Sequence, residues 1–317
     1  MKYNWAIIGH EKQLTRIEAD IESGNLAHAY VLAGTDSVGK FSIAKKMAGI
    51  LQCENDFCHK CAACLQVRSG NHLDTMEFAD DGESIKIEQV RNIIDRLSMT
   101  GQSRYKIVLI ENMERMTLEA ANSFLKILEE PPTRTIFIMT TDDIRRLLST
   151  VISRVRVIKF SSLPVSYLIE KLHELYPEKE VEAIKHASLL SLGKTGKAVD
   201  LIEQPEMLAS YTKAYFDVQN FLERKNITDR FSYVAELDED ETQRAIFSFL
   251  EIMTHVVRTK LLEGGIEKER GMVILSKAAE AGKLIRKNVN VKLVLENLML
   301  QLGAQRGPEF SLNFPDK

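Results

Sequence analysis

Short runs of hydrophobic residues alternate with amphipathic stretches through the first half of the chain. Uninterrupted hydrophobic runs are typical of strands buried in a parallel sheet, and hydrophobic residues at helical spacing predict helices that cover it. The strands are expected at residues 31–33, 106–110 and 135–139, and the helices at residues 42–51, 88–98 and 118–128. This alternation predicts an α/β fold with a parallel sheet of about five strands.

The second half of the chain has almost no strand pattern. After the linker-like residues 161–164, hydrophobic residues recur at helical spacing almost to the C-terminus. The expected helices cover residues 165–175, 178–188, 208–222, 227–236, 240–262, 272–287 and 291–302. The pattern therefore predicts three domains, which are an α/β domain at residues 1–160, a small helical domain at residues 161–205 and an all-α domain at residues 206–317.

Composition narrows the class of protein without identifying it. The 317 residues are 44% hydrophobic and 27% charged, and the net charge is −3. The protein is therefore not basic overall, and any contact with nucleic acid must come from a local patch or from partners. The N-terminus has no apolar secretory core, and no run reaches the roughly 18 apolar residues of a membrane helix. We predict a cytoplasmic protein.

A glycine-rich loop follows the first hydrophobic strand. Gly34, Gly39 and Lys40 have the spacing of a phosphate-binding loop, in which backbone N–H groups and the lysine bind phosphate. The next position normally supplies a Ser or Thr hydroxyl for magnesium, but here it is Phe41. We therefore expect a degenerate, vestigial phosphate site without productive ATP binding.

A second departure lies at the end of the strand at residues 106–110. In ATPases such a strand ends in Asp-Glu, which supports magnesium and activates the attacking water. This chain has Glu111-Asn112 instead, and an asparagine amide cannot accept a proton as a base. Two independent positions thus predict the absence of intrinsic ATPase activity.

The four cysteines of the chain lie within one short window. Cys53, Cys58, Cys61 and Cys64 have the pattern C-x4-C-x2-C-x2-C, which suits one tetrahedral, structural zinc ion. Two disulfides are the alternative, but adjacent C-x2-C pairs form disulfides poorly and the predicted compartment is reducing. The sequence favours zinc in a module at residues 53–64 that is attached to the α/β domain.

Several motifs together resemble the delta-prime family of bacterial DNA polymerase III clamp-loader subunits, which are AAA+ proteins. The matching elements are the four-cysteine module, His28-Ala29-Tyr30, Ile87-Glu88-Gln89-Val90-Arg91, Ala121-Asn122-Ser123-Phe124-Leu125-Lys126, Leu128-Glu129-Glu130-Pro131-Pro132 and Ser153-Arg154-Val155. Val155 departs from the cysteine of the family's Ser-Arg-Cys element. Since a thiol is not the group that meets phosphate, this departure should matter little.

The resemblance implies a fold, partners and a functional residue. It implies an AAA+ phosphate-loop domain, a helical lid at residues 161–205 and a collar at residues 206–317 that joins other subunits in a ring. The implied partners are the gamma/tau and delta subunits, and through the assembly the sliding clamp and primed DNA. Ser153 and Arg154 match the element whose arginine is supplied in trans to ATP in a neighbouring subunit. The implied whole is the DNA polymerase III holoenzyme, a DNA-directed DNA polymerase and nucleotidyltransferase.

Alternatives remain at three points. The chain could be a catalytically active, gamma/tau-like clamp-loader ATPase, although Phe41 and Asn112 weigh against it. It could instead be a zinc-bearing DNA-binding adaptor, although the net charge and the lack of a dense basic cluster oppose this. Lys194 and Lys197, in the region that resembles a lid, could be exposed lysines or could contact phosphate or DNA.

Overall fold

The computed structural model describes residues 2–80, 82–223, 227–236, 243–287 and 289–302. The chain forms two compact units, which are described separately. Unit 1 comprises residues 1–179 and 193–199, and unit 2 comprises residues 180–192 and 200–317.

A five-stranded sheet with only parallel pairings is the centre of unit 1. The strands are β1 (Ala29–Ala33), β2 (Thr75–Phe78), β3 (Lys106–Ile110), β4 (Thr135–Thr141) and β5 (Arg156–Lys159). Their spatial order is β2-β3-β4-β1-β5. Because β1 lies between β4 and β5, the loops that follow β1 and β4 meet at the carboxyl ends of the strands, where α/β proteins bind ligands. The predicted α/β class is confirmed.

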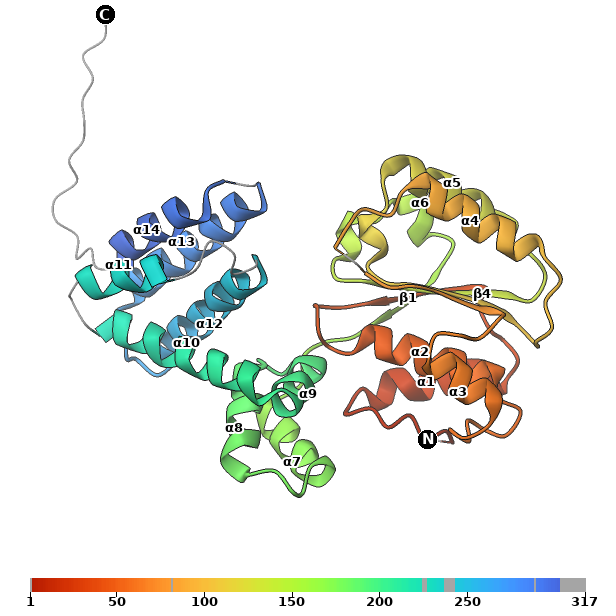
Figure 1. Ribbon diagram of the computed structural model, residues 1–317, viewed down its shortest axis with the longest axis horizontal. Helices are drawn as coiled ribbons and strands as arrows, with labels where there is room; N and C mark the ends of the chain where they lie inside the picture. Colours follow the sequence, from red (N-terminus) through yellow and green to blue (C-terminus); the bar gives the residue numbers. More distant parts are fainter. Residues whose placement is uncertain (1, 81, 224–226, 237–242, 288, 303–317) are drawn as a thin grey trace, which may run out of the picture. The chain divides into compact units, whose positions relative to one another are not determined.

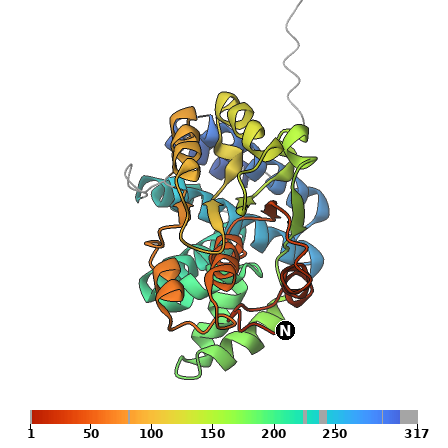
Figure 2. The same ribbon diagram turned by 90° about the vertical axis from the view of Figure 1, so that its right-hand side faces the viewer.

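Helices cover both faces of this sheet, as Figures 1 and 2 show. One face carries α1 (Glu11–Glu22), α2 (Lys40–Gln52) and α3 (Ala62–Arg68), and the other carries α4 (Ile87–Ser98), α5 (Leu118–Glu129) and α6 (Ser149–Ile152). Side chains of a strand alternate between the faces, so Leu32 packs toward α2 while Val31 packs toward α4 and α5. Burial on both faces explains why the central strands are hydrophobic throughout.

The short helical turns η1 (Met113–Arg115) and η2 (Ile144–Arg146) follow β3 and β4, and α7 (Val165–Leu175) follows β5. The first residues of α9 (Thr195–Glu203) also belong to unit 1. The backbone at Leu163 donates to the carbonyl of Gly193 at 2.8 Å. A Cβ at position 193 would lie 2.1 Å from the Leu163 oxygen, so only glycine permits this approach.

Unit 2 is helical in the residues that the structure describes. It contains α8 (Val181–Leu190), α10 (Pro205–Glu223), α11 (Ile227–Glu236), α12 (Gln243–Leu262), α13 (Lys268–Arg286) and α14 (Val291–Leu302), together with the end of α9. A hydrophobic core joins α10 through α14. A helical region after the sheet is thus confirmed, while the predicted helix start at position 240 lies outside the described residues.

Two arginine side chains in unit 2 donate hydrogen bonds to backbone carbonyls at the C-terminal ends of helices. Arg230 is 1% exposed and donates to the carbonyls of Phe221 and Met299 at 2.9 and 3.3 Å. Arg270 donates to the carbonyl of Leu302 at 3.2 Å. These carbonyls lie in the last turns of α10 and α14. Carbonyl groups in the last turn have no donor within their own helix and carry the negative end of the helix dipole. The cations therefore stabilise the bundle where those helices end.

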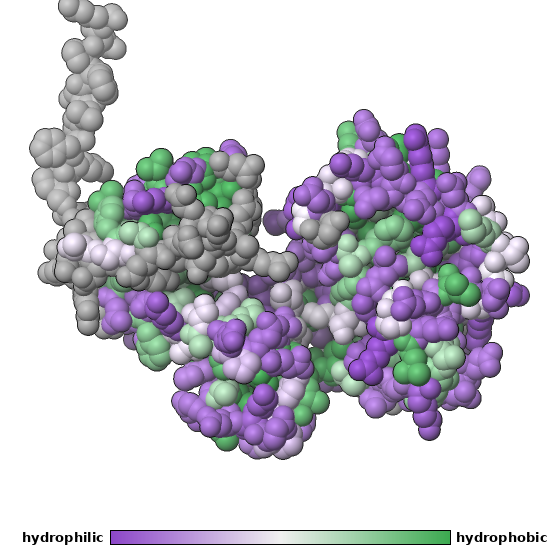
Figure 3. Space-filling view, in the orientation of Figure 1, coloured by the Kyte–Doolittle hydropathy of each residue, from purple (hydrophilic) through white to green (hydrophobic). Residues whose placement is uncertain are grey.

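The face of unit 1 seen in Figure 3 is mainly hydrophilic, with hydrophobic residues scattered among hydrophilic ones. Among the described residues, none of the helices combines the length and apolar composition that crossing a membrane requires.

Candidate functional site: a phosphate loop, a surface arginine and a cysteine cluster

The phosphate loop connects β1 to α2 at the carboxyl ends of the strands. A Cβ at Gly34 would lie 2.3 Å from the backbone oxygen of Phe160, so a glycine is required where β1 passes the end of β5. Gly39 caps α2 with a φ of 87°, in the left-handed region that favours glycine. The loop and the start of α2 therefore have the backbone arrangement that the sequence predicts.

The lysine of the loop is bound by its own chain. Lys40 has a side chain only 5% exposed, and its Nζ donates to the carboxylate of Asp142 at 2.7 Å and to the carbonyl of Thr35 at 2.8 Å. Asp142 directly follows β4, the neighbour of β1, so the strand order brings the two together. An ammonium that would otherwise meet phosphate thus has a carboxylate partner within the fold.

A second ion pair lies across the same loop. Lys194 is 8% exposed and its Nζ lies 2.7 Å from the carboxylate of Asp36. Lys197 is also buried, and its backbone N–H donates to the carbonyl of Ser37 at 3.3 Å. The interpretation of these two lysines as exposed, solvated side chains is therefore wrong. Burying a charge favours a partner, and Asp36 supplies it for Lys194.

The first turn of α9 packs directly on the phosphate loop. The Thr195 hydroxyl donates to the carbonyl of Val38 at 2.9 Å. A Cβ at Gly196 would lie 2.8 Å from the Ser37 oxygen, so the two backbones approach more closely than another residue would allow. Protein atoms therefore occupy the side of the loop that faces α9.

The residues after β3 form a network with the loop after β2. The Asn112 side chain donates to the carboxylate of Asp80 at 2.6 Å, and Arg115 Nε lies 3.2 Å from the same carboxylate. Glu111 accepts the Asp80 N–H at 2.9 Å, and burial raises the pKa of the Glu111 carboxyl above its ordinary value. The position that activates water in ATPases here cross-links two loops.

Arg154 follows the short helix α6 and is held by three contacts. One guanidinium nitrogen, NH2, donates to the carboxylate of Glu129 at 2.7 Å. The other, NH1, donates to the carbonyl of Thr150 at 2.9 Å and to the hydroxyl of Ser153 at 3.2 Å. The side chains of Arg154 and Glu129 remain 34% and 51% exposed. Arg154 is thus ordered yet accessible from outside the unit.

Arg154 and the phosphate loop lie at opposite ends of the strands. In the register of β1 and β5, Tyr30 pairs with Arg156 and Ala33 pairs with Lys159. Arg154 therefore lies before the amino end of β5, whereas the phosphate loop follows the carboxyl end of β1. β5 lies between these two levels, and its four residues span roughly 13 Å. The structure does not bring Arg154 to the phosphate loop of its own chain.

The four cysteines converge where α2 ends and α3 begins, with Cys53 as the C-cap of α2 and Cys64 in the first turn of α3. The Sγ atoms of Cys53, Cys58, Cys61 and Cys64 all lie within 4.8 Å of one another. Cys53 Sγ lies 3.8 Å from the Sγ atoms of Cys58 and Cys61. A disulfide requires about 2.05 Å, whereas sulfurs at ~2.3 Å from a tetrahedral zinc ion are separated by about 3.8 Å. The cysteines are unpaired, and the cluster could bind a metal such as zinc.

Backbone donors around the sulfurs suit a thiolate site. The N–H groups of Cys61 and Cys64 point at the sulfurs of Cys58 and Cys61 at 3.3 and 3.4 Å. Backbone donors lower the pKa of the Cys58 thiol to about 6, while burial raises that of Cys64.

Phe57 packs on α2 at Gly49, where a Cβ would lie 2.5 Å from the ring. The module is thereby attached to the α/β core.

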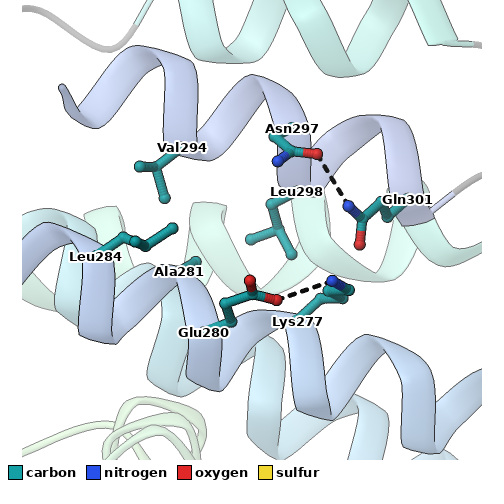
Figure 4. Close-up of a pocket in the computed structure, with 8 residues that line it drawn as sticks. All are labelled: Lys277, Glu280, Ala281, Leu284, Val294, Asn297, Leu298 and Gln301. Carbon is teal, nitrogen blue, oxygen red and sulfur yellow. Dashed lines mark hydrogen bonds and ion pairs between the residues drawn. The ribbon is translucent and has the colours of Figure 1, made fainter. Parts of the chain in front are cut away.

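A shallow groove lies between α13 and α14 in unit 2 (Figure 4). Its lining residues are Lys277, Glu280, Ala281, Leu284, Val294, Asn297, Leu298 and Gln301. The polar members pair among themselves, Lys277 with Glu280 at 2.8 Å and Gln301 with Asn297 at 2.9 Å. Hydrocarbon side chains and paired polar groups suit helix packing better than phosphate binding.

The sequence interpretation did not identify three carboxylates as partners of the cations in these sites. They are Asp36, Glu129 and Asp142, which pair with Lys194, Arg154 and Lys40. Asp142 follows the hydrophobic run at residues 135–139, so the rule that parallel strands end at one side of a sheet could have indicated it. The pairing of Glu129 with Arg154 has no comparable sequence signal, because it depends on where α5 ends.

Comparisons with known proteins agree with these features. The family model for the DNA polymerase III delta subunit matches residues 9–164. The delta' subunit of DNA polymerase III from Bacillus subtilis (strain 168) is 36% identical over 158 residues, which are 49% of this chain and 48% of that protein. The gamma subunit from Buchnera aphidicola subsp. Acyrthosiphon pisum (strain APS) is 27% identical over 285 residues, with coverages of 87% and 72%.

The chain spans only part of these curated relatives, from 72% of the Buchnera gamma subunit to 32% of the tau subunit from Salmonella typhimurium. A solved structure of a DNA polymerase III gamma subunit-related protein from Thermotoga maritima superposes with a TM-score of 0.55 at 20% identity, covering 90% of this chain and 98% of that one. It shows a shared AAA+-like fold. Residues 9–164 of this chain thus match the family model of this DNA polymerase III subunit, and the similar proteins include delta', gamma and tau subunits.

Proposed function

We propose that the chain is an ATPase-defective delta-prime subunit of the DNA polymerase III clamp loader. In this role it forms a hetero-oligomeric ring with gamma/tau and delta subunits and helps to load the sliding clamp onto primed DNA. It supplies Arg154, supported by Ser153, to the ATP site of a neighbouring subunit. The match of residues 9–164 to the family model supports the assembly, and the separation of Arg154 from its own phosphate loop carries the finer proposal.

The phosphate loop supports the loss of intrinsic activity. Gly34, Gly39 and Lys40 keep the form of the loop, but the lysine is bound to Asp142. Phe41 offers no oxygen to magnesium, and Asn112 offers no base to water. We infer that this loop is vestigial and that productive ATP binding does not occur there.

Arg154 has the chemistry that the trans role needs. A guanidinium is permanently charged, and its fork of N–H groups matches phosphate oxygens. An arginine supplied from another subunit stabilises the charge that develops on phosphate during transfer. Since Arg154 is accessible and lies at the far end of the strands from Lys40, a phosphate that it contacts would belong to another chain.

ATP hydrolysis by the isolated chain, compared with hydrolysis by the reconstituted loader, tests the proposal. We expect no turnover above background by the isolated chain, and no change when Lys40 is replaced by Ala. An isolated gamma or tau subunit serves as the positive control for the assay. Ordinary turnover by the isolated chain that is lost with Lys40→Ala would establish the alternative, a catalytically active gamma/tau-like ATPase.

We further propose that Cys53, Cys58, Cys61 and Cys64 hold one structural zinc ion. Four ligands leave no open coordination position, so the ion would stabilise the module without taking part in a reaction. We expect one zinc per chain in purified protein and loss of the metal in Cys58→Ser, with His59→Ala as the control that keeps it. Retention of zinc by Cys58→Ser would contradict this ligand set.

The division of the chain into an AAA+ domain at residues 1–160, a lid at 161–205 and a collar at 206–317 stays a prediction. We propose it as the arrangement by which the ring assembles. Limited proteolysis of the purified chain tests it, and the expected early cleavage sites lie close to residues 160 and 205.

A further inference from the structure

We propose that Glu129 is a positioning residue for Arg154, and this inference rests on the proposed trans role of that arginine. Glu129 is the last residue of α5, and its Oε1 accepts from Arg154 NH2 at 2.7 Å. The carboxylate holds the guanidinium in the orientation in which it is presented to the phosphate of a neighbouring subunit.

The guanidinium of Arg154 has contacts of two kinds, local ones from neighbouring residues and one from a distant residue. The contacts to Thr150 and Ser153 come from within four residues of Arg154, so they move with the helix α6 and the turn after it. Glu129 lies 25 residues earlier in the chain, on a different helix. It therefore fixes the guanidinium relative to the body of the α/β core.

The contacts leave part of the arginine available. An arginine carries five N–H donors, and the three contacts above engage NH1 and NH2 but not Nε. A free arginine side chain has considerable rotamer freedom, which must be lost before it can bind phosphate. Holding it in one orientation beforehand removes that cost from the reaction, which is the general advantage of a preorganised site.

The exposure of the pair indicates that its role is not folding stability. Arg154 and Glu129 are 34% and 51% exposed, and exposed ion pairs contribute little to stability. A carboxylate that only stabilised the fold at this position would have a negligible effect when removed. A carboxylate that orients Arg154 would instead change the rate of hydrolysis at the facing ATP site.

The test is a double-mutant cycle in the reconstituted clamp loader, with kcat and KM for ATP measured in the presence of the clamp and primed DNA. The variants are Glu129→Ala, Arg154→Ala and the double variant. Glu129→Gln is included because its amide oxygen can still accept from Arg154 NH2. The matched control is Glu130→Ala, since Glu130 is the exposed neighbour at the end of the same helix.

We expect Glu129→Ala to lower kcat at the facing site by about two- to fivefold with KM unchanged, from the range typical of exposed ion pairs. Glu129→Gln should recover most of this loss, and Glu130→Ala should match the wild type. In the Arg154→Ala background, Glu129→Ala should have no further effect. All variants should assemble into the ring and unfold at the wild-type temperature.

The possible failures are distinguishable. If Arg154→Ala leaves hydrolysis unchanged, the proposed trans role itself is wrong. If Arg154→Ala lowers hydrolysis but Glu129→Ala does not, or if Glu129→Ala raises it, the positioning role is overturned while the trans role stands. An equal loss from Glu129→Ala in the presence and absence of Arg154 would also overturn it, since the carboxylate would then act independently of the arginine.

Discussion

The two ends of the parallel sheet differ in how their charged residues are partnered. At the carboxyl ends, Lys40 is 5% exposed on its side chain and is bound by Asp142, and the first turn of α9 packs on the loop. At the amino ends, Arg154 is held by contacts of its own unit yet stays 34% exposed. One cation is enclosed within the fold, and the other is ordered at the surface.

The contrast between the two ends indicates how a nucleotide-binding fold can serve a reaction that occurs elsewhere. The carboxyl ends of the strands are the usual ligand site of such a sheet, and here protein contacts occupy part of it. A loop that is satisfied internally can keep its shape without a ligand. The proposed contribution to catalysis instead comes from the opposite end, where a side chain can reach a second subunit.

Arg154→Ala is expected to have the largest effect of the substitutions that test this comparison. In other NTPases a supplied arginine accounts for about 10³ to 10⁵ in rate, so we expect at least a 100-fold loss of turnover at the facing site. Assembly should stay intact because the ion pair is exposed. Single-turnover hydrolysis by the reconstituted loader measures the effect. Arg145→Ala is the matched control, because Arg145 is an exposed arginine paired with a carboxylate near the carboxyl ends. Equal effects of the two variants would remove the distinction between the ends.

Asp142→Ala should cause the next largest change, in stability rather than activity. It leaves a buried ammonium with the Thr35 carbonyl as its remaining contact of the two that Nζ makes, at an expected cost of about 1–3 kcal/mol in the free energy of unfolding. Urea denaturation at pH 7 measures this cost. Arg145→Ala, which breaks the pair of that exposed arginine with Asp143, should cost less than about 0.5 kcal/mol. No ATP turnover should appear, because Phe41 and Asn112 are unchanged.

Gly196→Ala tests the close packing of α9 on the phosphate loop. Replacing a helical glycine by alanine normally stabilises a protein by about 0.5–1 kcal/mol. At this position the added Cβ would lie 2.8 Å from the Ser37 oxygen, so we expect destabilisation by about 1 kcal/mol instead. Gly282→Ala in α13 is the control, since its nearest neighbour would lie 3.9 Å away and the ordinary stabilisation should follow. If both variants stabilise, the contact between α9 and the loop is not tight.

Glu111→Gln should change the stability least, and the size of its effect depends on pH. Burial raises the pKa of Glu111 above 4.5, so ionisation costs stability as the pH rises through the folded-state value. The Gln variant avoids this cost and can still accept the Asp80 N–H. We expect it to be the more stable form at pH 7 to 8, with the advantage fading toward pH 4. Thermal unfolding across this range checks the trend, and Glu178→Gln, at an exposed position in a turn, should show no such trend.

Much of the fold could be predicted because the central strands are buried on both faces. The strands β1, β3 and β4 read as uninterrupted hydrophobic runs, and the cysteine spacing indicated a metal-binding cluster. The edge strands β2 and β5 were not located individually, since each contacts only one neighbouring strand and keeps partly exposed positions. A pattern of hydrophobic residues carries little information at such edges.

The partners of the site residues were not predicted, for a different reason. The pair of Lys40 and Asp142 joins residues 102 positions apart, and it depends on β4 lying beside β1. The pair of Lys194 and Asp36 joins residues 158 positions apart. Spacing along the chain does not determine such contacts. They follow from strand order and from the path of the chain after β5.

The helix α2 runs from Lys40 to Gln52, and Cys53 is its C-cap. Lys40 and Cys53 therefore lie at opposite ends of one helix about 20 Å long. Removal of a bound metal ion from the cysteines would destabilise the C-terminal end of α2, while the ion pair between Lys40 and Asp142 would still hold its N-terminal end. After chelation, amide hydrogen exchange should therefore become faster in the C-terminal turns of α2 and stay unchanged near Gly34 and Gly39 of the phosphate loop.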